Sequence, residues 1–232
     1  MEKEDALVSI AEDQGGYFTA KQALQAGYSY RDQHYHKTRG NWLQIERGMY
    51  RLRNYPYPQR DDLVILSLLS HNRAGEPQAV VSHESALAIH RMSDANPARI
   101  HLTVPPGFRK QMPPGIVLHR ARLSAKDWME YNGYRVTTPL RTLLDIAESP
   151  SGLSYLGSAV YDALYRGLVR PAQLLAADTS REVRKLLISA IEAAEQRIYG
   201  PARKEIEGAE GLEPVEAVEG LETHGRQEHN AR

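Results

Sequence analysis

The sequence predicts an α+β protein made of two folded parts, a small helical part that ends in a β-hairpin and a larger part that mixes strands and helices. Within residues 4–52, three short segments with helical spacing precede two segments in which apolar and polar residues alternate. From residue 61 onward, strand-like and helix-like segments follow one another. RNYPYPQR at 53–60, rich in Pro and Tyr, separates the two parts as a linker.

The composition is that of a globular protein, and it excludes several kinds of site. The 232 residues are 41% apolar and 25% charged, as in typical soluble domains. The chain has no cysteine, which rules out disulfides, thiolate zinc sites and cysteine nucleophiles. The acidic start, MEKEDALVS, does not match a secretory signal, and the longest apolar run, LVILSLL from Leu63, is too short to span a membrane. We therefore expect no membrane partner and a cytoplasmic location.

The net charge of +0 conceals an uneven distribution of charge along the chain. Residues 1–18 carry one Lys against five acids, and residues 205–232 carry eight Glu against two Arg. Residues 19–60, in contrast, carry eight Lys and Arg against two acids. This basic segment favours a polyanionic partner.

Three short helices are expected in the first forty residues. EDALVSIAE at 4–12 places its apolar residues on one helix face. Thr19 is a good N-cap for the helix AKQALQA, which stops at Gly27. Ser29 caps a third helix that runs to about Arg39.

A β-hairpin is expected directly after the third helix. In WLQIERGMYRLR at 42–53, apolar and polar residues alternate on both sides of a turn at Arg47-Gly48. Three helices followed by a hairpin are typical of a winged helix-turn-helix, in which the third helix is the recognition element and the hairpin is the wing.

The third helix, YRDQHYHKTR at 30–39, contains no aliphatic side chain. Arg, Lys, His, Tyr and Thr are side chains that reach phosphates and base edges in the major groove. Tyr28, Tyr35, Trp42 and Ile45 are expected to complete its inner face. By itself the stretch is also consistent with a solvated helix or loop, because most charged runs are solvated. Its N-cap, the two preceding helices and the following hairpin favour DNA binding.

The predicted DNA-binding residues lie in three places. They are Ser29, Tyr30, Arg31, His34, Lys37, Thr38 and Arg39 in the third helix and at its ends, Thr19 and Lys21 at the start of the second helix, and Arg47 on the wing. The N-terminus of the second helix would help to hold a phosphate. The wing would reach the DNA backbone or the minor groove.

The second part is expected to be a mixed α/β domain with a small sheet flanked by helices. Helices are predicted over 61–72, 83–92, 139–149, 154–169, 171–177 and 181–198, and strands over 80–81, 98–105, 115–121 and 134–138. From about Tyr199 the chain becomes Glu-rich without aromatic residues, which is typical of disorder. The predicted domain limits are 1–54 for the winged helix, 61–199 for the second domain and 200–232 for an acidic, disordered tail.

Histidines in the second part are the most obvious group for chemistry. His83 and His90, seven residues apart on a predicted helix, lie about 10 Å apart along its axis, too far to share one metal ion. His101 and His119 lie on predicted strands, but no spacing matches a zinc helix motif. We interpret the group as a capped helix start with surface and boundary histidines, and expect no metal and no cofactor.

Catalysis has no support from the remaining polar residues. The carboxylates Asp127, Glu130, Asp145 and Glu148 have no obvious Lys or His partner, and PPGFRKQMPPG at 105–115 is too poor in glycine for a phosphate loop. We therefore expect no catalytic residues and no enzyme activity. A smaller basic group, Arg109, Lys110, Arg120 and Arg122, is consistent with contacts to DNA phosphates or an acidic partner, and equally with an ordinary exposed strand edge.

The chain resembles the AbiEi family of antitoxins from type IV toxin–antitoxin systems. The segments that carry the resemblance are GGYFTAKQALQAGYS at 15–29, YHKTRGNWLQIERGMYRL at 35–52, VVSHESALAIHRMSD at 80–94, HLTVPPGFR at 101–109, VLHRARL at 117–123 and YRVTTPLRTLLDIA at 134–147. The resemblance covers about residues 5–175. One departure is Lys37, where relatives commonly carry an apolar residue.

The resemblance implies two activities and two partners. The winged helix would bind double-stranded operator DNA and repress the protein's own operon, and the second domain would be an antitoxin domain. The toxin partner would be a nucleotidyltransferase-like protein, counteracted without the need for a stable complex. Because one winged helix buries only about 600–1,000 Å², tight repression would also require two copies on repeated half-sites.

Three alternatives remain open at this point. One is a protein-interaction module, in which the winged helix has lost DNA binding and the second domain alone engages a partner. A basic face buried against the second domain would favour it. Another is a stand-alone transcriptional regulator without a toxin partner. The third is a nuclease, which would require metal-dependent cleavage through His83, Glu84 or Asp145.

Overall fold

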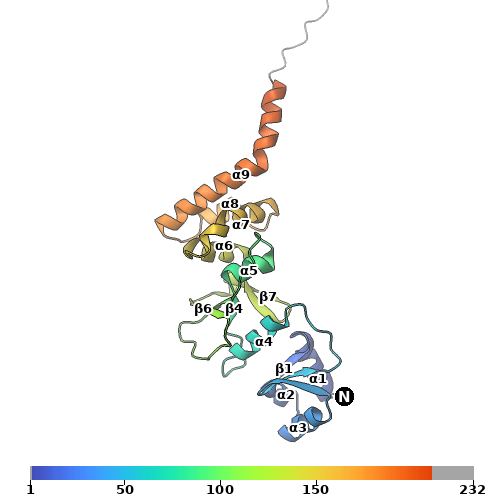
Figure 1. Ribbon diagram of the computed structural model, residues 1–232. Helices are drawn as coiled ribbons and strands as arrows, with labels where there is room; N and C mark the ends of the chain where they lie inside the picture. Colours follow the sequence, from blue (N-terminus) through green and yellow to red (C-terminus); the bar gives the residue numbers. More distant parts are fainter. Residues whose placement is uncertain (1, 211–232) are drawn as a thin grey trace, which may run out of the picture. The chain divides into compact units, whose positions relative to one another are not determined.

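The computed structural model describes the chain over residues 2–210, with side chains over 2–200. The structure confirms the predicted α+β class and the winged helix at the N-terminus (Figure 1). The N-terminal elements are α1 (Glu2–Glu12), β1 (Tyr17–Thr19), α2 (Ala20–Gln25), α3 (Tyr30–Thr38), β2 (Trp42–Glu46) and β3 (Met49–Leu52). β2 and β3 form the predicted hairpin, and β1 pairs with β3 to complete a three-stranded antiparallel sheet.

β1 was not predicted from the sequence. It has only three residues, too few for an alternating pattern, and its residues Tyr17 and Phe18 read as a lead into the cap at Thr19. Its pairing with the wing strand β3 fixes the wing to the start of α2.

The caps of α2 and α3 confirm both predicted helix starts. Thr19 Oγ1 accepts a hydrogen bond from the backbone of Gln22 at 3.2 Å, and the Gln22 side chain accepts one from the backbone of Thr19 at 2.8 Å. Ser29 and Asp32 form the same reciprocal pair, at 3.2 and 3.0 Å. Each capping box satisfies two backbone donors that the first helical turn leaves free, and so fixes where the helix begins.

An aromatic cluster holds the winged helix together. Phe18 lies edge-on to Trp42 with ring centroids 4.9 Å apart, and Tyr28 lies 5.0 Å from Trp42. Leu7 of α1 is buried in the same cluster. α3 adds no aliphatic side chain, so the packing beneath it comes from its neighbours.

The inner face of α3 differs in part from the prediction. Tyr28 and Trp42 are buried as expected, but Tyr35 is 53% exposed. Ile45 packs against a different buried cluster, made largely of residues from the second part of the chain. The half-buried ring of His36 takes the place of Tyr35, stacked on Trp42 with centroids 4.7 Å apart. Lys37 supplies no apolar side chain to this face, and the ring of His36, one position earlier, packs there instead.

A five-stranded mixed sheet forms the centre of the second part. Its elements are α4 (Asp61–Ser70), β4 (Val80–Val81), α5 (His83–His90), β5 (Ile100–Val104), β6 (Ile116–Arg120), the 3-10 turn η1 (Ala125–Asp127), β7 (Trp128–Tyr131) and β8 (Tyr134–Thr137). The strand order is β6-β5-β4-β8-β7, in which β5–β6 and β4–β8 are parallel. β7 was missed because it is an edge strand whose last three residues are exposed, which leaves no buried face to see in the sequence.

Four helices follow the sheet: α6 (Pro139–Glu148), α7 (Leu153–Tyr165), α8 (Pro171–Leu175) and α9 (Arg181–Glu210). Leu143 and Ile146 of α6, Leu156 and Val160 of α7, and Leu187 of α9 belong to one buried cluster. α9 extends beyond the predicted helix end at residue 198, across the start of the expected acidic tail. Residues 211–232 of that tail lie outside the described part of the chain, and the three domain limits stay a prediction.

Candidate DNA-binding surface

The outer face of α3 is free of contacts with the protein core. Tyr30 is 72% exposed, and the other side chains of this face are exposed as well. We call Tyr30, Arg31, His34, Lys37 and Thr38 the α3 surface. It offers two cations and three further polar side chains with hydrogen-bonding groups, which suits both phosphates and base edges. All five residues were predicted, and the structure places them on one exposed helix.

A buried glutamine sets the position of α3. Gln33 is 3% exposed, and its amide donates to the carbonyl of Ala20 at 3.1 Å and to the carbonyl of Tyr28 at 3.4 Å. These bonds join α3 to the first turn of α2 and to the loop between the two helices. Gln33 was not predicted from the sequence, because nothing in a stretch of polar residues distinguishes the one whose side chain turns inward.

The charge of α3 is predominantly positive. Its one acid, Asp32, is occupied by the cap, and hydrogen bonds from Ser29 lower the pKa of Asp32. Lys3 of α1 lies 3.4 Å from the same carboxylate in an exposed ion pair, a type that contributes little to stability. The carboxylate of Asp32 therefore stays ionised but is engaged by the cap and by Lys3, while Arg31 and Lys37 face solvent.

Several predicted contacts at the ends of the helices have structural roles. The hydroxyls of Thr19 and Ser29 accept hydrogen bonds within their caps. Lys21 is exposed, and its ammonium donates to the carbonyl of Arg73. Arg39 lies over the ring of Tyr35, with its guanidinium carbon 5.6 Å from the centroid.

The wing presents a single cation at its tip. Arg47 is exposed in the turn between β2 and β3, where Gly48 has φ +76°, a conformation that favours glycine. The tip is therefore tightly turned and leaves the Arg47 side chain in solvent, as predicted for a wing.

Arg51 does not contribute to the basic surface, although it was counted in the basic segment. Its side chain is fully buried, with the guanidinium carbon 3.5 Å from the ring centroid of Tyr57 and 5.5 Å from that of Tyr17. It donates to the carbonyls of Leu52 and Tyr55. Arg51 thus ties the wing strand to the linker, a role in which an arginine matches a cage of rings and carbonyls.

The histidines of the second part are not all at the surface, which corrects the interpretation from the sequence. His83 is 8% exposed, and its ring stacks on that of His119 with centroids 3.5 Å apart. His101 Nδ1 lies 2.8 Å from the carboxylate of Glu84 and 3.2 Å from His119 Nε2. Burial opposes ionisation of Glu84, but hydrogen bonds from His101, the backbone and Ser151 outweigh it and lower the pKa of Glu84 to about 2.

This histidine cluster forms because β5 and β6 are parallel neighbours and α5 starts beside them. The spacing of seven between His83 and His90 was irrelevant, since His90 instead contacts the carbonyl of Thr137 at 2.7 Å. Within residues 2–200, no group of three or more His, Asp and Glu is arranged to hold a metal ion.

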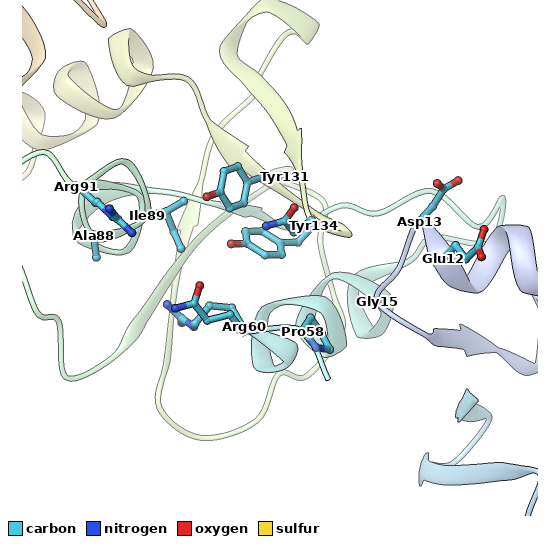
Figure 2. Close-up of a pocket in the computed structure, with 12 residues that line it drawn as sticks. Glu12, Asp13, Gly15, Pro58, Arg60, Ala88, Ile89, Arg91, Tyr131 and Tyr134 are labelled. Atoms are coloured by element: carbon cyan, nitrogen blue, oxygen red, sulfur yellow. The ribbon is translucent and has the colours of Figure 1, made fainter. Parts of the chain in front are cut away.

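A separate pocket of about 440 Å³ lies beside the turn that follows α1. Figure 2 shows the residues that line it. Tyr131 and Tyr134, with ring centroids 5.7 Å apart, line it together with Arg60, whose guanidinium is paired with Asp62 at 2.9 Å. Among the described side chains, none of the buried polar atoms without a partner belongs to this pocket. We therefore assign it no ligand.

A winged helix with an exposed, basic third helix is typical of DNA-binding regulators of transcription. Two family models match the sequence: one described as a transcriptional regulator, AbiEi antitoxin, over residues 5–53, and one described as the AbiEi antitoxin C-terminal domain, over residues 79–189. Together they match more than half of the 232 residues. The chain belongs to the AbiEi family of antitoxins.

One solved structure supports the fold over nearly the whole chain. The crystal structure of the RV2827C protein from Mycobacterium tuberculosis superposes with a TM-score of 0.52 at 16% sequence identity, covering 92% of this chain and 83% of that chain. At this identity the likeness shows the fold alone. No curated protein matches the sequence. No helix in the described part of the chain is both long and apolar enough to cross a membrane.

Proposed function

We propose that this antitoxin represses its own operon by binding operator DNA through the α3 surface, and that it counteracts a nucleotidyltransferase-like toxin of a type IV system in the cytoplasm. The DNA-binding part of this proposal rests on the α3 surface. It is a capped helix whose outer side chains are polar or cationic, exposed, and held by packing contributed by other elements.

In the proposed complex, α3 enters the major groove. Tyr30, Arg31 and His34, near its N-terminus, approach base edges, while Lys37 and Thr38 reach base edges or phosphates. Ser29 and Arg39 lie at the two ends of the helix and contact the DNA backbone. Lys21 leaves the Arg73 carbonyl for a phosphate at the start of α2, where Thr19 caps the helix. Arg47 reaches the backbone or the minor groove from the wing.

The number of phosphate contacts in this complex predicts how strongly the binding constant depends on salt. If about five cations contact phosphates, the logarithm of the binding constant falls with the logarithm of the salt concentration at a slope of roughly −4 to −5. One winged helix buries only about 600–1,000 Å² on DNA, so two copies on repeated half-sites are proposed for tight repression.

Fluorescence anisotropy with the upstream region of the protein's own gene, against a scrambled duplex, tests the repressor proposal. The expected result is a preference of about 10³-fold or more at moderate salt, the size of specific readout. Equal, weak binding to both duplexes would reduce the winged helix to a general phosphate binder.

The antitoxin half rests on the family match over residues 79–189. It is tested by expressing a nucleotidyltransferase-like protein encoded beside this gene, with and without the antitoxin, and measuring growth. We expect the antitoxin to restore growth, and Arg31→Ala to restore it equally, because that substitution affects DNA binding alone. Absence of rescue would favour a stand-alone regulator.

The protein-interaction alternative is not favoured by the structure. Burial of the basic face against the second part would have favoured it, whereas the side chains of the α3 surface are exposed. The proposed function needs no catalytic residue and no cofactor.

A further inference from the structure

A polar pocket lies between the start of α5, the parallel strands β5 and β6, and α6. It has a volume of about 460 Å³. The residues that matter for its chemistry are His83, His119, Arg120, Arg141, Asp145 and Glu148. All of them belong to the central sheet and its helices, so the pocket is independent of the winged helix.

Asp145 lies in the wall of this pocket, and only one of its two carboxylate oxygens has a hydrogen-bond partner. Its side chain is 3% exposed, and its Oδ1 accepts from Arg141 Nε at 2.8 Å and lies 2.6 Å from an Arg141 Nη. Its Oδ2 is buried without any hydrogen-bond partner. A buried carboxylate oxygen without a donor is costly, and in native proteins such atoms are few and call for an explanation.

The cations nearby do not supply the missing donor. Arg141 directs Nε and one Nη at the other oxygen of Asp145, and Arg120 donates to the carbonyls of Phe108 at 2.8 Å and Pro106 at 3.3 Å. Glu148 is exposed at the edge of the pocket, three residues after Asp145 and so on the same side of α6. Asp145 Oδ2 and the exposed carboxylate of Glu148 are therefore acceptors in this pocket for which the described residues supply no donor.

The pKa values of Asp145 and His83 agree with a lack of donors and of positive charge beside Asp145 Oδ2. Burial raises the pKa of Asp145 to about 6, and Arg141 offsets the effect only in part. Burial also lowers the pKa of His83 to about 3, so its imidazole is neutral near pH 7 and adds no positive charge. A bound cation would oppose this effect of burial, lower the pKa of Asp145 and favour its charged form.

The backbone at His83 is held in a conformation that side chains rarely adopt. Its φ is +50°, the left-handed region, at the first residue of α5. Such conformations persist where the surrounding structure imposes them, and they concentrate at binding sites. Here the conformation accompanies the stacking of the His83 ring on His119 in the wall of the pocket.

We propose that this pocket binds a guanidinium or ammonium group, whose N–H donors reach Asp145 Oδ2 and Glu148. The group is an arginine or lysine side chain of a partner protein, or a free organic cation of the same chemistry. Binding completes the hydrogen bonding of Asp145, and neither DNA binding nor operon repression requires it.

The test is an NMR titration of the full ¹⁵N-labelled chain with methylguanidinium, n-butylammonium and the neutral amide N-methylacetamide. We expect the two cations to shift the amide signals of residues 141–149 and of His83 and His119, with roughly millimolar affinity for so few atoms. The neutral amide should bind at least about tenfold more weakly. Equal binding of all three probes, or shifts confined to other regions, would overturn the proposal.

Variants separate binding from folding. Asp145→Asn should weaken methylguanidinium binding about tenfold or more, but it disturbs a buried ion pair and can reduce stability. Glu148→Gln lies at the exposed edge and should fold normally while weakening binding about two- to fivefold. Glu130→Gln, which removes an exposed carboxylate outside the pocket, is the matched control and should bind like the unmodified chain. Unchanged affinity in both pocket variants would also reject the site.

The source of the cation is distinguished by comparing methylguanidinium with the capped tripeptide acetyl-Gly-Arg-Gly-amide. Tighter binding of the peptide assigns the pocket to an arginine presented by a partner protein. Equal or weaker binding of the peptide assigns it to a free cation. Acetyl-Gly-Gly-Gly-amide should leave the spectrum unchanged, and binding of this peptide would contradict the proposed chemistry.

Discussion

α3 and α4 are helices of nearly equal length that are stabilised in opposite ways. α4 buries six of its ten residues, among them Leu63, Val64 and Leu66. α3 buries one of its nine residues, and that one is Gln33. α4 is held by its own side chains, whereas α3 is held by its cap and by aromatic residues of the segments around it.

This difference follows from what each helix has to leave free. A helix that inserts into DNA cannot use its outer face for packing, and a short helix is unstable without tertiary contacts. In α3 the capping box of Ser29, the stacking of His36 on Trp42 and the bonds of Gln33 provide those contacts. Removing a contact should therefore unfold α4 but displace α3.

The largest effect is expected for Leu63→Ala in α4. Leu63 is 1% exposed, and truncation of a buried leucine costs about 2–5 kcal/mol of unfolding free energy. Urea denaturation followed by circular dichroism would measure it. Operator affinity of the fraction that remains folded should be unchanged, since Leu63 belongs to a different buried cluster from Tyr28 and Trp42 beneath α3. Leu186→Ala, at a 40% exposed position of α9, is the control and should cost far less.

A smaller loss of stability, with a loss of DNA binding, is expected for Gln33→Ala. The substitution removes donors from the carbonyls of Ala20 and Tyr28 and leaves a gap beneath α3. The expected cost is about 1–3 kcal/mol, and operator binding should weaken because α3 is no longer fixed relative to α2. Gln25→Ala, at an exposed position of α2, should change neither. A Gln33→Ala protein with full stability and full affinity would show that α3 is positioned by other contacts.

The same contrast explains how much of the structure could be predicted from the sequence. α4 and the strands β5, β6 and β8 carry their own apolar patterns, and the caps at Thr19 and Ser29 are local signals. β1, β7 and the inward turn of Gln33 depend on partners distant in sequence, and no local pattern encodes them.

The sites divide in the same way. The residues of the α3 surface were predicted because one continuous segment contains them. The pocket around Asp145 was not predicted, because it joins α5, β5, β6 and α6, and because Asp145 pairs with Arg141 and not with a Lys or His. A site formed by one continuous segment can be predicted from the sequence, whereas a site that the sheet topology assembles from several elements cannot.

The cap of α3 allows a finer test of how the helix is held. Ser29→Ala removes the acceptor for the backbone N–H of Asp32, which costs about 1 kcal/mol. Ser29→Asn keeps a capping side chain and should recover most of that stability. If the serine hydroxyl also contacts DNA, Ser29→Asn will regain stability but not affinity in the anisotropy assay. Recovery of both would restrict Ser29 to the cap.

The smallest change in stability, with a clear change in function, is expected for Arg31→Ala. Arg31 is exposed on α3, so the thermal midpoint should stay where it is. Operator affinity should fall, and the salt slope should become shallower by about one if the guanidinium contacts a phosphate. Lys185→Ala removes an equal charge from an exposed position of α9 and should leave both quantities unchanged. A large drop in the thermal midpoint of Arg31→Ala would show that α3 depends on its outer face for stability, and the contrast with α4 would then fail.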